Sequence, residues 1–335
     1  MGGAITFPLS DSGHIVRLWG TWLDDDIIDS CRSTIHPKLG IPLRQGVETF
    51  HSNSLAEAVD DVQCIFIAVS SDGFVPVLKR LFEVQRLPCS VFCLTKGFVE
   101  EGRRVKRLSE WAAKELSKRV GEDQFGWVSV GGPVKAVELS RMVPSASVYG
   151  VSGASLREVS RHFSTQYYRI VRCDDVAGVE LSSAFKNVYA VGLGICDGIY
   201  KQRSEAEYHN ICAILFNQGV AEISTIVEQV GGDRSTVYGL AGLGDLYVTG
   251  RSGRNRKYGE LIGAGGQPEE TYERMTLEGE LAEGYDALAK GVRWWEKEQK
   301  RSLDELPLLK TLHRIVINRK KPEKEIYSFV KWYGS

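Results

Sequence analysis

Two lysines in apolar surroundings are the residues of this chain best suited to proton transfer. Lys186 lies inside an otherwise apolar segment of helical periodicity, 180–190, and Lys96 directly follows a short apolar run, 90–94. A lysine in such a helix usually extends its amine to the rim of a core. A desolvated amine beside a second cation has a lowered pKa instead and exchanges protons near neutrality. Lys96 could supply that cation from the carboxyl end of a strand, where open α/β sheets bind ligands.

A glycine-rich segment, 239–260, carries side chains that suit a phosphate group. It places Asp245, Thr249, Arg254 and Asn255 in and around tight turns. A guanidinium, a hydroxyl and the backbone N–H groups of a helix start are the donors that a phosphate dianion needs. Taken alone, the segment is more typical of a solvated surface loop. We interpret it as a phosphate-binding segment only because the two lysines accompany it.

Glycines elsewhere resemble a dinucleotide-binding turn. Segment 192–198 has one residue too many and continues a helical pattern, so we reject it as a cofactor loop. At the start of the chain, Gly2 leads into an apolar helix and then a strand that ends at Trp19. In a dinucleotide-binding fold, a helix and then a strand follow the third glycine of the Gly-x-Gly-x-x-Gly turn. By this order, Gly2 would be that third glycine.

The elements that must position these residues change character near Asp174–Asp175. Before this point strands and helices alternate, which favours an α/β fold with a Rossmann-type doubly wound parallel sheet. The predicted strands are 14–19, 62–69, 90–94, 125–130, 146–149 and 168–171, and the predicted helices are 24–30, 74–82 and 105–120. After it, helical periodicity prevails. We therefore expect a dinucleotide-binding domain at 1–174 and an all-α substrate domain at 175–335.

Composition excludes several classes of protein. The 335 residues hold 42 Lys+Arg against 43 Asp+Glu, so no basic excess favours nucleic acid as a partner. No apolar run approaches the ~20 residues of a membrane span. Seven cysteines, an odd number without a ligand spacing, suit a reducing cytoplasm and predict no metal site.

Several segments, in this order, resemble the NAD(P)-dependent glycerol-3-phosphate dehydrogenase family. The resemblance covers nearly the whole chain, and the Lys-Asn and Gly-Asp-Leu segments are specific to the family. It rests on segments 13–19, 95–97, 131–133, 178–188, 239–246 and 253–257 and on Glu283-Gly284.

The resemblance implies a reaction and a set of site residues. The expected reaction is hydride transfer between NAD or NADP and C2 of glycerol 3-phosphate, giving dihydroxyacetone phosphate. The implied catalytic residues are Lys186, Lys96 and Asp245. The implied substrate-binding residues are Lys96, Asn187, Thr249, Arg254 and Asn255, and the implied cofactor-binding residues are Gly2, Trp19, Lys96, Arg254 and Glu283.

The choice of cofactor is less clear from the residues. The end of the strand at Trp19 carries neither the carboxylate that favours NAD nor the arginine that favours NADP. Asp24 to Asp26 lie close behind it and favour NAD slightly. We expect a small phosphorylated substrate as partner, neither nucleic acid nor a membrane span, and leave a homodimer open.

Two other interpretations remain. One is a related hydroxyacid dehydrogenase, which would also use a helix lysine but would not need the loop at 253–257. The other is a homologue that binds a phosphorylated metabolite without catalysis. Lys96, Lys186 and Asp245 argue against the second interpretation. An absent first strand argues for it.

That first strand, with its Gly-x-Gly, is missing before Met1. In the usual strand order it lies at the centre of the sheet, between 14–19 and 62–69. We therefore expect the natural protein to begin roughly ten residues earlier, with a strand of about 5–6 residues. Without that strand we expect an open slot between the flanking strands.

Overall fold

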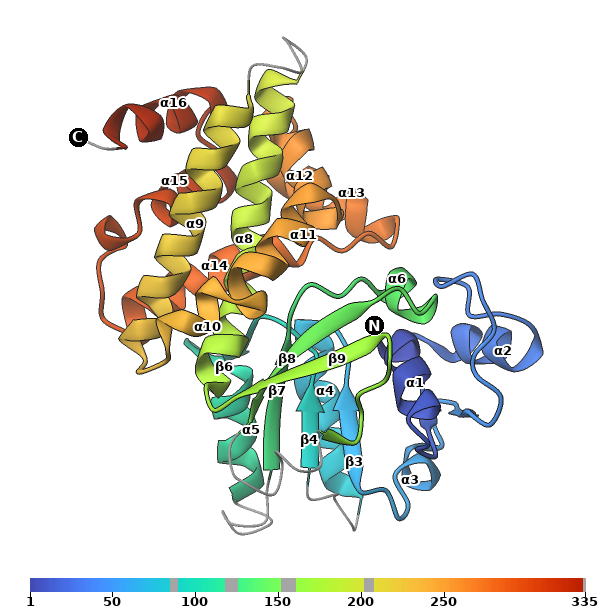
Figure 1. Ribbon diagram of the computed structural model, residues 1–335. Helices are drawn as coiled ribbons and strands as arrows, with labels where there is room; N and C mark the ends of the chain where they lie inside the picture. Colours follow the sequence, from blue (N-terminus) through green and yellow to red (C-terminus); the bar gives the residue numbers. More distant parts are fainter. Residues whose placement is uncertain (85–89, 118–125, 152–160, 202–207, 334–335) are drawn as a thin grey trace. The chain divides into compact units, whose positions relative to one another are not determined.

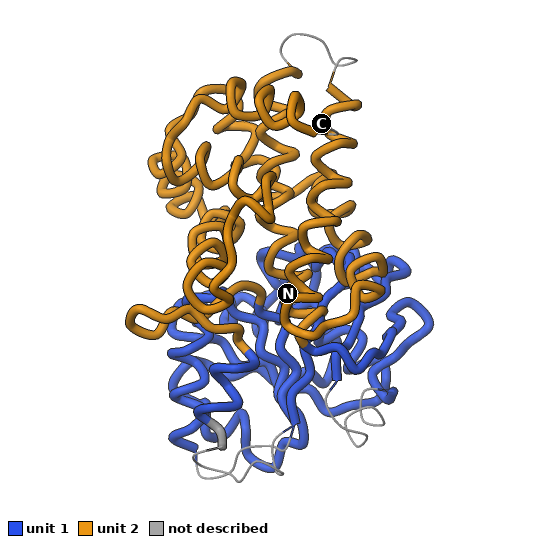
Figure 2. The backbone as a smooth tube through the Cα atoms, turned by 90° about the vertical axis from the view of Figure 1, so that its left-hand side faces the viewer, with its two compact units in different colours: residues 1–95, 109–176 blue, residues 96–108, 177–335 orange. Residues whose placement is uncertain are grey.

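The computed structural model describes residues 1–84, 90–117, 126–151, 161–201 and 208–333. These residues form two compact units (Figure 2). Unit 1 comprises residues 1–95 and 109–176, and unit 2 comprises residues 96–108 and 177–335. The division therefore differs from a single boundary at 174–175, because the short segment 96–108 belongs with the helical unit.

Unit 1 is built around a five-stranded sheet of order β3-β4-β7-β8-β9. Its strands are β3 (Cys64–Ile67), β4 (Ser90–Cys93), β7 (Gly126–Gly131), β8 (Ser145–Val151) and β9 (Tyr168–Cys173). Strands β3, β4 and β7 are parallel, whereas β8 runs antiparallel to β7 and parallel to β9. The predicted α/β class with a parallel sheet is confirmed by the β3–β4, β4–β7 and β8–β9 pairs, and the antiparallel β7–β8 pair departs from it.

The remaining strands of unit 1 form a second, smaller sheet. Strand β1 (Arg17–Trp19) pairs in parallel with β2 (Glu48–Phe50), in register from Arg17 opposite Glu48. This sheet is separate from the five-stranded one, so β1 and β3 are not hydrogen-bonded neighbours. The sequence predicted the strand ending at Trp19, but it did not predict β2.

Helices of unit 1 pack apolar side chains on the five-stranded sheet. Helix α1 is buried along most of its length, and its Phe7 shares a cluster with Phe92 and Val128 of the sheet. Phe74 of α4 packs edge-on against Trp111 of α5 and Trp127 of β7. The helices are α1 (Gly2–Asp11), α2 (Asp25–Ser33), α3 (Leu55–Ala58), α4 (Ser71–Glu83), α5 (Leu108–Ser117) and α6 (Ala136–Ser140).

In its described residues, unit 2 is helical apart from one hairpin. Figure 1 shows its two longest helices, α8 (Val176–Tyr200) and α9 (His209–Gln229), side by side. The others are α10 (Arg234–Tyr238), α11 (Asp245–Arg251), α12 (Arg254–Gly263), α13 (Pro268–Leu277), α14 (Glu283–Arg293), α15 (Pro307–Val316) and α16 (Pro322–Trp332), with short π or 3₁₀ turns at Leu240–Gly244, Trp294–Glu298 and Leu303–Glu305. Among the described residues, only α9 has the length and hydropathy of a membrane span, and it packs in the core of this unit.

The helix predicted over 105–120 is wrong at its start, where the structure has the hairpin of unit 2. Strands β5 (Phe98–Glu101) and β6 (Arg104–Arg107) pair antiparallel, and α5 begins only at Leu108. Phe98 enters the core of unit 2, where its ring lies 5.6 Å from that of Phe185. Cross-strand pairing and this burial override the helical pattern of the isolated segment. Residues 118–120, and Phe125 of a predicted strand, lie outside the described residues.

Two helices of unit 2 cross with their backbones in contact. A Cβ built on Gly194 or Gly198 of α8 would overlap the carbonyl oxygens of Arg256 or Glu260 of α12. Gly259 and Gly263 of α12 meet the backbone of α8 in the same way. The glycines rejected above as a cofactor loop therefore serve helix packing, and they fix the start of α12 relative to α8.

Candidate active site

All predicted catalytic and substrate-binding residues lie in unit 2. Lys186 stands in the middle of α8, where only 7% of its side chain is exposed. Its Nζ donates hydrogen bonds to Oδ1 of Asp245 and, over 3.0 Å, to Oγ1 of Thr249. The amine is therefore held at one point in the interior of the unit.

Asp245 and Thr249 come from the first and second turns of α11. Residues four apart in a helix lie on the same face, so both side chains reach Lys186. The π-helical turn Leu240–Gly244 leads directly into Asp245. Only 3% of the Asp245 side chain is exposed, and its Oδ2 has no hydrogen-bond partner among the described residues.

Lys96 supplies a second cation to the same carboxylate. Its Nζ lies 4.0 Å from Oδ2 of Asp245, and its side chain is 23% exposed. The hairpin that follows Lys96 is anchored by Phe98 in the core and by an ion pair of 2.8 Å between Arg293 and Glu100. Segment 96–108 belongs to unit 2 although the sequence on both sides of it belongs to unit 1, and it carries the active-site candidate Lys96.

The electrostatics of the cluster favour proton exchange by Lys186. Burial and the nearby Lys96 cation lower the pKa of its ammonium, the Asp245 carboxylate raises it, and the net result is a pKa of about 8. An amine with such a pKa is present in both protonation states near neutral pH. The arrangement can therefore give or take a proton.

A second network extends from the neighbouring residue of α8. Asn187 accepts a hydrogen bond of 2.9 Å from Nδ2 of Asn255 and donates one of 3.4 Å to Oε2 of Glu283. Oδ1 of Asn255 accepts from the backbone N–H of Gly284 over 2.9 Å. The network joins α8, α12 and α14, and it brings together three of the predicted site residues.

Arg254 differs from the other predicted residues of unit 2 because its side chain stands outside both hydrogen-bond networks. It is the first residue of α12, its side chain is exposed, and no hydrogen bond or ion pair links it to the described residues. Gly253 precedes it with φ of +125°, a value that residues with a Cβ rarely adopt. No acidic residue occupies the first turn of α12, so its N–H groups and the guanidinium present positive charge together.

Two predicted residues, Gly2 and Trp19, lie in unit 1. Gly2 is the first residue of α1, and a Cβ built on it would lie 3.6 Å from the Cβ of Ala68, just after β3. Trp19 is the last residue of β1, and its Nε1 is buried without a hydrogen-bond partner among the described residues. Both stand at the carboxyl ends of strands.

Two site-adjacent residues were not predicted from the sequence. Asp197 of α8 and Arg256 of α12 form an ion pair with a buried carboxylate, and Arg256 also contacts the end of α11. A carboxylate inside an apolar, glycine-containing helix was a usable signal, because a buried acid needs a charged partner. The partner itself could not be chosen among several arginines.

A mixed α/β unit and a helical unit with a buried, carboxylate-held lysine together define a nicotinamide-dependent dehydrogenase. The chain matches the NAD-dependent glycerol-3-phosphate dehydrogenase family, its N-terminus over residues 1–156 and its C-terminus over residues 175–327. It belongs to that family.

Individual relatives match along nearly their whole length. The chain is 31% identical over 333 residues to the NADP(+)-dependent glycerol-3-phosphate dehydrogenase of Archaeoglobus fulgidus, covering 98% of this chain and 95% of the relative. It is 32% identical to a glycerol-3-phosphate dehydrogenase [NAD(P)+] of a Thermoanaerobacter species, covering 98% and 93%. The crystal structure of the Coxiella burnetii glycerol-3-phosphate dehydrogenase superposes with a TM-score of 0.83 at 26% identity, covering 98% of this chain and 95% of that one.

Proposed function

We propose that this protein interconverts sn-glycerol 3-phosphate and dihydroxyacetone phosphate with NAD or NADP. The observation that carries the proposal is the buried amine of Lys186, held by Asp245 and Thr249 with its pKa lowered to about 8. The relatives named above carry this activity in their names, which supports the same reaction here.

Residues of unit 1 fit a dinucleotide. The first turn of α1 contains no acidic residue and no side-chain cap, so its N–H groups are suited to a pyrophosphate. The bare Cα of Gly2 allows close approach beside the end of β3, and the buried Nε1 of Trp19 is a donor in need of an acceptor. A nicotinamide cofactor held there would supply the donor or acceptor for the hydride at C2.

The residues of unit 2 have separate tasks in the proposed mechanism. As an ammonium, Lys186 donates a proton to the oxygen on C2 during reduction, and as a neutral amine it removes that proton during oxidation. Asp245 and Thr249 hold its Nζ, and Lys96 adds positive charge beside the same oxygen. Arg254 and the N–H groups of α12 bind the phosphate.

Three further residues complete the proposed site. Asn187 and Asn255 bridge α8 and α12 through a hydrogen bond between their amides, and the resemblance implies that both contact the substrate. Glu283, which accepts a hydrogen bond from Asn187, lies where the resemblance implies contact with the cofactor.

The preference for NAD over NADP rests on one exposed carboxylate. Asp24 already accepts hydrogen bonds from N and Oγ1 of Thr21, and Asp25 accepts from N and Oγ of Ser52. Asp26 alone of the three remains exposed. We therefore keep NAD as a slight preference, which a comparison of rates with NADH and NADPH tests.

We also propose a cytoplasmic location, and a homodimer stays an open alternative. Every cysteine in the described ranges is a free thiol, as suits a reducing compartment. Cys89 lies outside those ranges. Analytical ultracentrifugation measures the assembly.

The experiment that tests the function compares substrates by oxidation of NADH or NADPH. We expect turnover of dihydroxyacetone phosphate and none of an unphosphorylated 3-hydroxyacid in the reverse direction. Preference for the hydroxyacid would support the related dehydrogenase class instead. Binding of the phosphorylated ligand without turnover would support a non-catalytic homologue.

A further inference from the structure

Arg256 contacts two other segments that carry site residues. Its Nη2 donates a hydrogen bond of 2.7 Å to Oδ1 of Asp197, and its Nε donates to Oδ2 of the same carboxylate. Its Nη1 donates to the carbonyl oxygen of Gly250. One guanidinium therefore joins α8, the last turn of α11 and the first turn of α12.

The carboxylate of this pair is buried. Only 4% of the Asp197 side chain is exposed, against 23% of Arg256. Burial raises the pKa of Asp197, whereas Arg256 lowers it. Because a buried carboxylate without a partner is costly, Arg256 is tied to this position.

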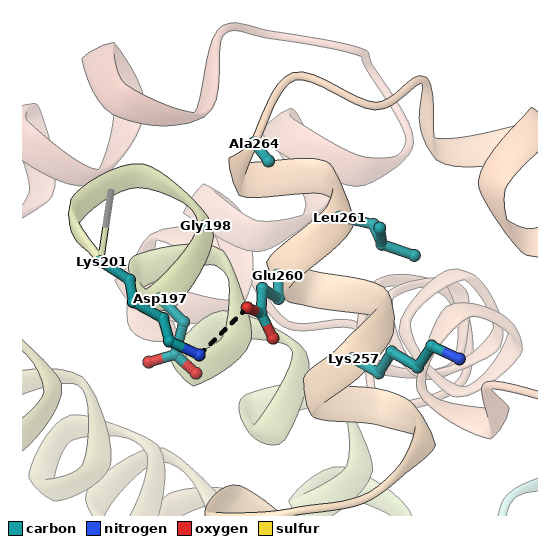
Figure 3. A pocket seen from close by; sticks show the side chains of 7 residues that line it. All are labelled: Asp197, Gly198, Lys201, Lys257, Glu260, Leu261 and Ala264. Carbon is teal, nitrogen blue, oxygen red and sulfur yellow. Dashed lines mark hydrogen bonds and ion pairs between the residues drawn. The ribbon is translucent and has the colours of Figure 1, made fainter. Parts of the chain in front are cut away.

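The other charges around the pair lie on its solvent side. Figure 3 shows Asp197 and Lys201 at the end of α8 facing Glu260 of α12 across a cavity of about 380 Å³, with an ion pair of 3.5 Å between Lys201 and Glu260. Lys257 also lines this cavity. Lys201 and Glu260 pair with each other and Lys257 pairs with Glu280, and among the described residues no hydrogen bond joins any of these side chains to Gly250.

The three joined segments are those that carry the candidate phosphate and proton-transfer groups. Gly250 directly follows Thr249, and Arg256 comes two residues after Arg254. Between them, Ser252 and Gly253 are exposed, and Gly253 has no side chain. The Arg256 guanidinium therefore connects the two ends of this turn through its hydrogen bond to Gly250.

We propose that Arg256 and Asp197 are positioning residues that fix the phosphate-binding turn at 250–255 relative to the lysine on α8. Neither residue touches the substrate in this role. They act by holding the N–H groups of α12 and the side chain of Arg254 at the distance that the phosphate requires. The inference rests on the proposed function, because it assumes that a phosphate binds at this turn.

The test uses Arg256→Lys, Asp197→Asn and the double variant of the full chain. A lysine keeps the charge but cannot contact Asp197 through two nitrogens and Gly250 at once. We expect the KM for dihydroxyacetone phosphate to rise about tenfold in each single variant, since small displacements of positioning groups have effects of this size. We expect kcat to change less than about threefold and the KM for NADH to stay unchanged.

The double variant and inorganic phosphate make the test specific. Because both residues act through one link, the double variant should have nearly the same KM as either single variant. The inhibition constant of inorganic phosphate, competing with substrate, should rise by the same factor as KM. Arg314→Gln is the matched control, because Arg314 forms a two-contact pair with Glu325 between α15 and α16, of 2.8 and 3.1 Å. It should leave every constant unchanged.

Two results would overturn the inference. One is an unchanged KM and phosphate inhibition constant in folded Arg256→Lys, with folding judged by circular dichroism and melting temperature. The other is a loss of kcat at constant KM, which indicates a smaller folded fraction and a merely structural pair. Failure of the proposed function has a different signature, because the wild-type protein would then not reduce dihydroxyacetone phosphate at all.

Discussion

Lys186 and Lys96 approach the same carboxylate from two segments separated by 90 positions in the chain, each on a different oxygen. Lys186 donates to Oδ1 of Asp245 and Lys96 lies 4.0 Å from Oδ2. The first cation is buried and the second is partly exposed. This geometry makes the protonation of Lys186 depend on both of its charged neighbours, with opposite signs.

The first prediction concerns the pH dependence of the two reaction directions. Because Lys186 must be an ammonium for reduction, kcat for dihydroxyacetone phosphate should fall as pH rises through about 8. Because it must be a neutral amine for oxidation, kcat for glycerol 3-phosphate should rise through the same value. Initial rates in both directions, measured over about one pH unit on either side of that midpoint, check the prediction. Flat profiles in both directions would remove Lys186 from the proton transfer.

The second prediction separates the two neighbours of Lys186. Asp245→Asn removes the charge that raises the pKa of Lys186, so the midpoint of the oxidation profile should move to lower pH. Lys96→Gln removes a charge that lowers this pKa, so the midpoint should move to higher pH. Residual rates measured over the full pH range give both midpoints. Shifts in the same direction for the two variants would contradict the electrostatic arrangement.

Removal of the amine itself is the third prediction. Lys186→Ala should lower kcat by about 10²–10⁴-fold, the usual contribution of a positioned acid–base group. Cofactor binding, followed by the fluorescence of NADH, should persist and would show that the fold is intact. Retention of more than about a tenth of the wild-type rate would refute the role, because such a loss is too small for general acid–base catalysis.

The sequence predicted strands best where the apolar run is nearly continuous. The run at 90–94 became β4, which is buried at every position, and the apolar run at 62–69 became β3, which is largely half-buried at the edge of the sheet. The pairing of β1 with β2 and the reversal at β8 depend on partners far along the chain, so local pattern does not reveal them. The basic run Arg104–Arg107 became a strand only through its pairing with Phe98–Glu101.

Prediction of the site was limited in the same way, because its contacts join residues far apart in the sequence. Lys186, Asp245 and Thr249 were predicted separately, and the structure brings them within hydrogen-bond distance. Asp197 and Arg256 were missed. The carboxylate in an apolar helix was a usable signal, but its partner is 59 positions away and is one of several arginines. An ion pair between two helices far apart in the sequence depends on how those helices cross. Four glycines on α8 and α12 set this crossing, so no single segment reveals the pair.

The fourth prediction concerns a buried carboxylate remote from the site. Glu222 of α9 accepts hydrogen bonds from Gln218, Tyr189 and the backbone N–H groups of Leu308 and Leu309, over 2.6 to 2.9 Å. In Glu222→Gln an NH₂ group replaces one acceptor and faces donors, so the free energy of unfolding should fall by about 2–4 kcal/mol. Urea denaturation measures the change. Tyr189→Phe, which removes one of the four donors, should cost less than Glu222→Gln; equal losses would show that the backbone contacts to α15 contribute little.

The last prediction addresses the phosphate end of the site. Arg254 is exposed and unpaired among the described residues, and it stands at the N-terminus of α12 beside a backbone with no acidic neighbour in the turn. A phosphate dianion bound there would contact the guanidinium through two nitrogens, so Arg254→Ala should weaken binding by about 2–5 kcal/mol. Arg254→Lys should not restore the affinity, because an ammonium is a point charge without the planar fork. Since the exposed side chain supports no other residue, the melting temperature should not change in either variant. The measurement is the KM for dihydroxyacetone phosphate beside the KM for NADH. A KM for the phosphorylated substrate that stays at the wild-type value in Arg254→Ala would show that this turn is a surface loop and that the phosphate binds elsewhere.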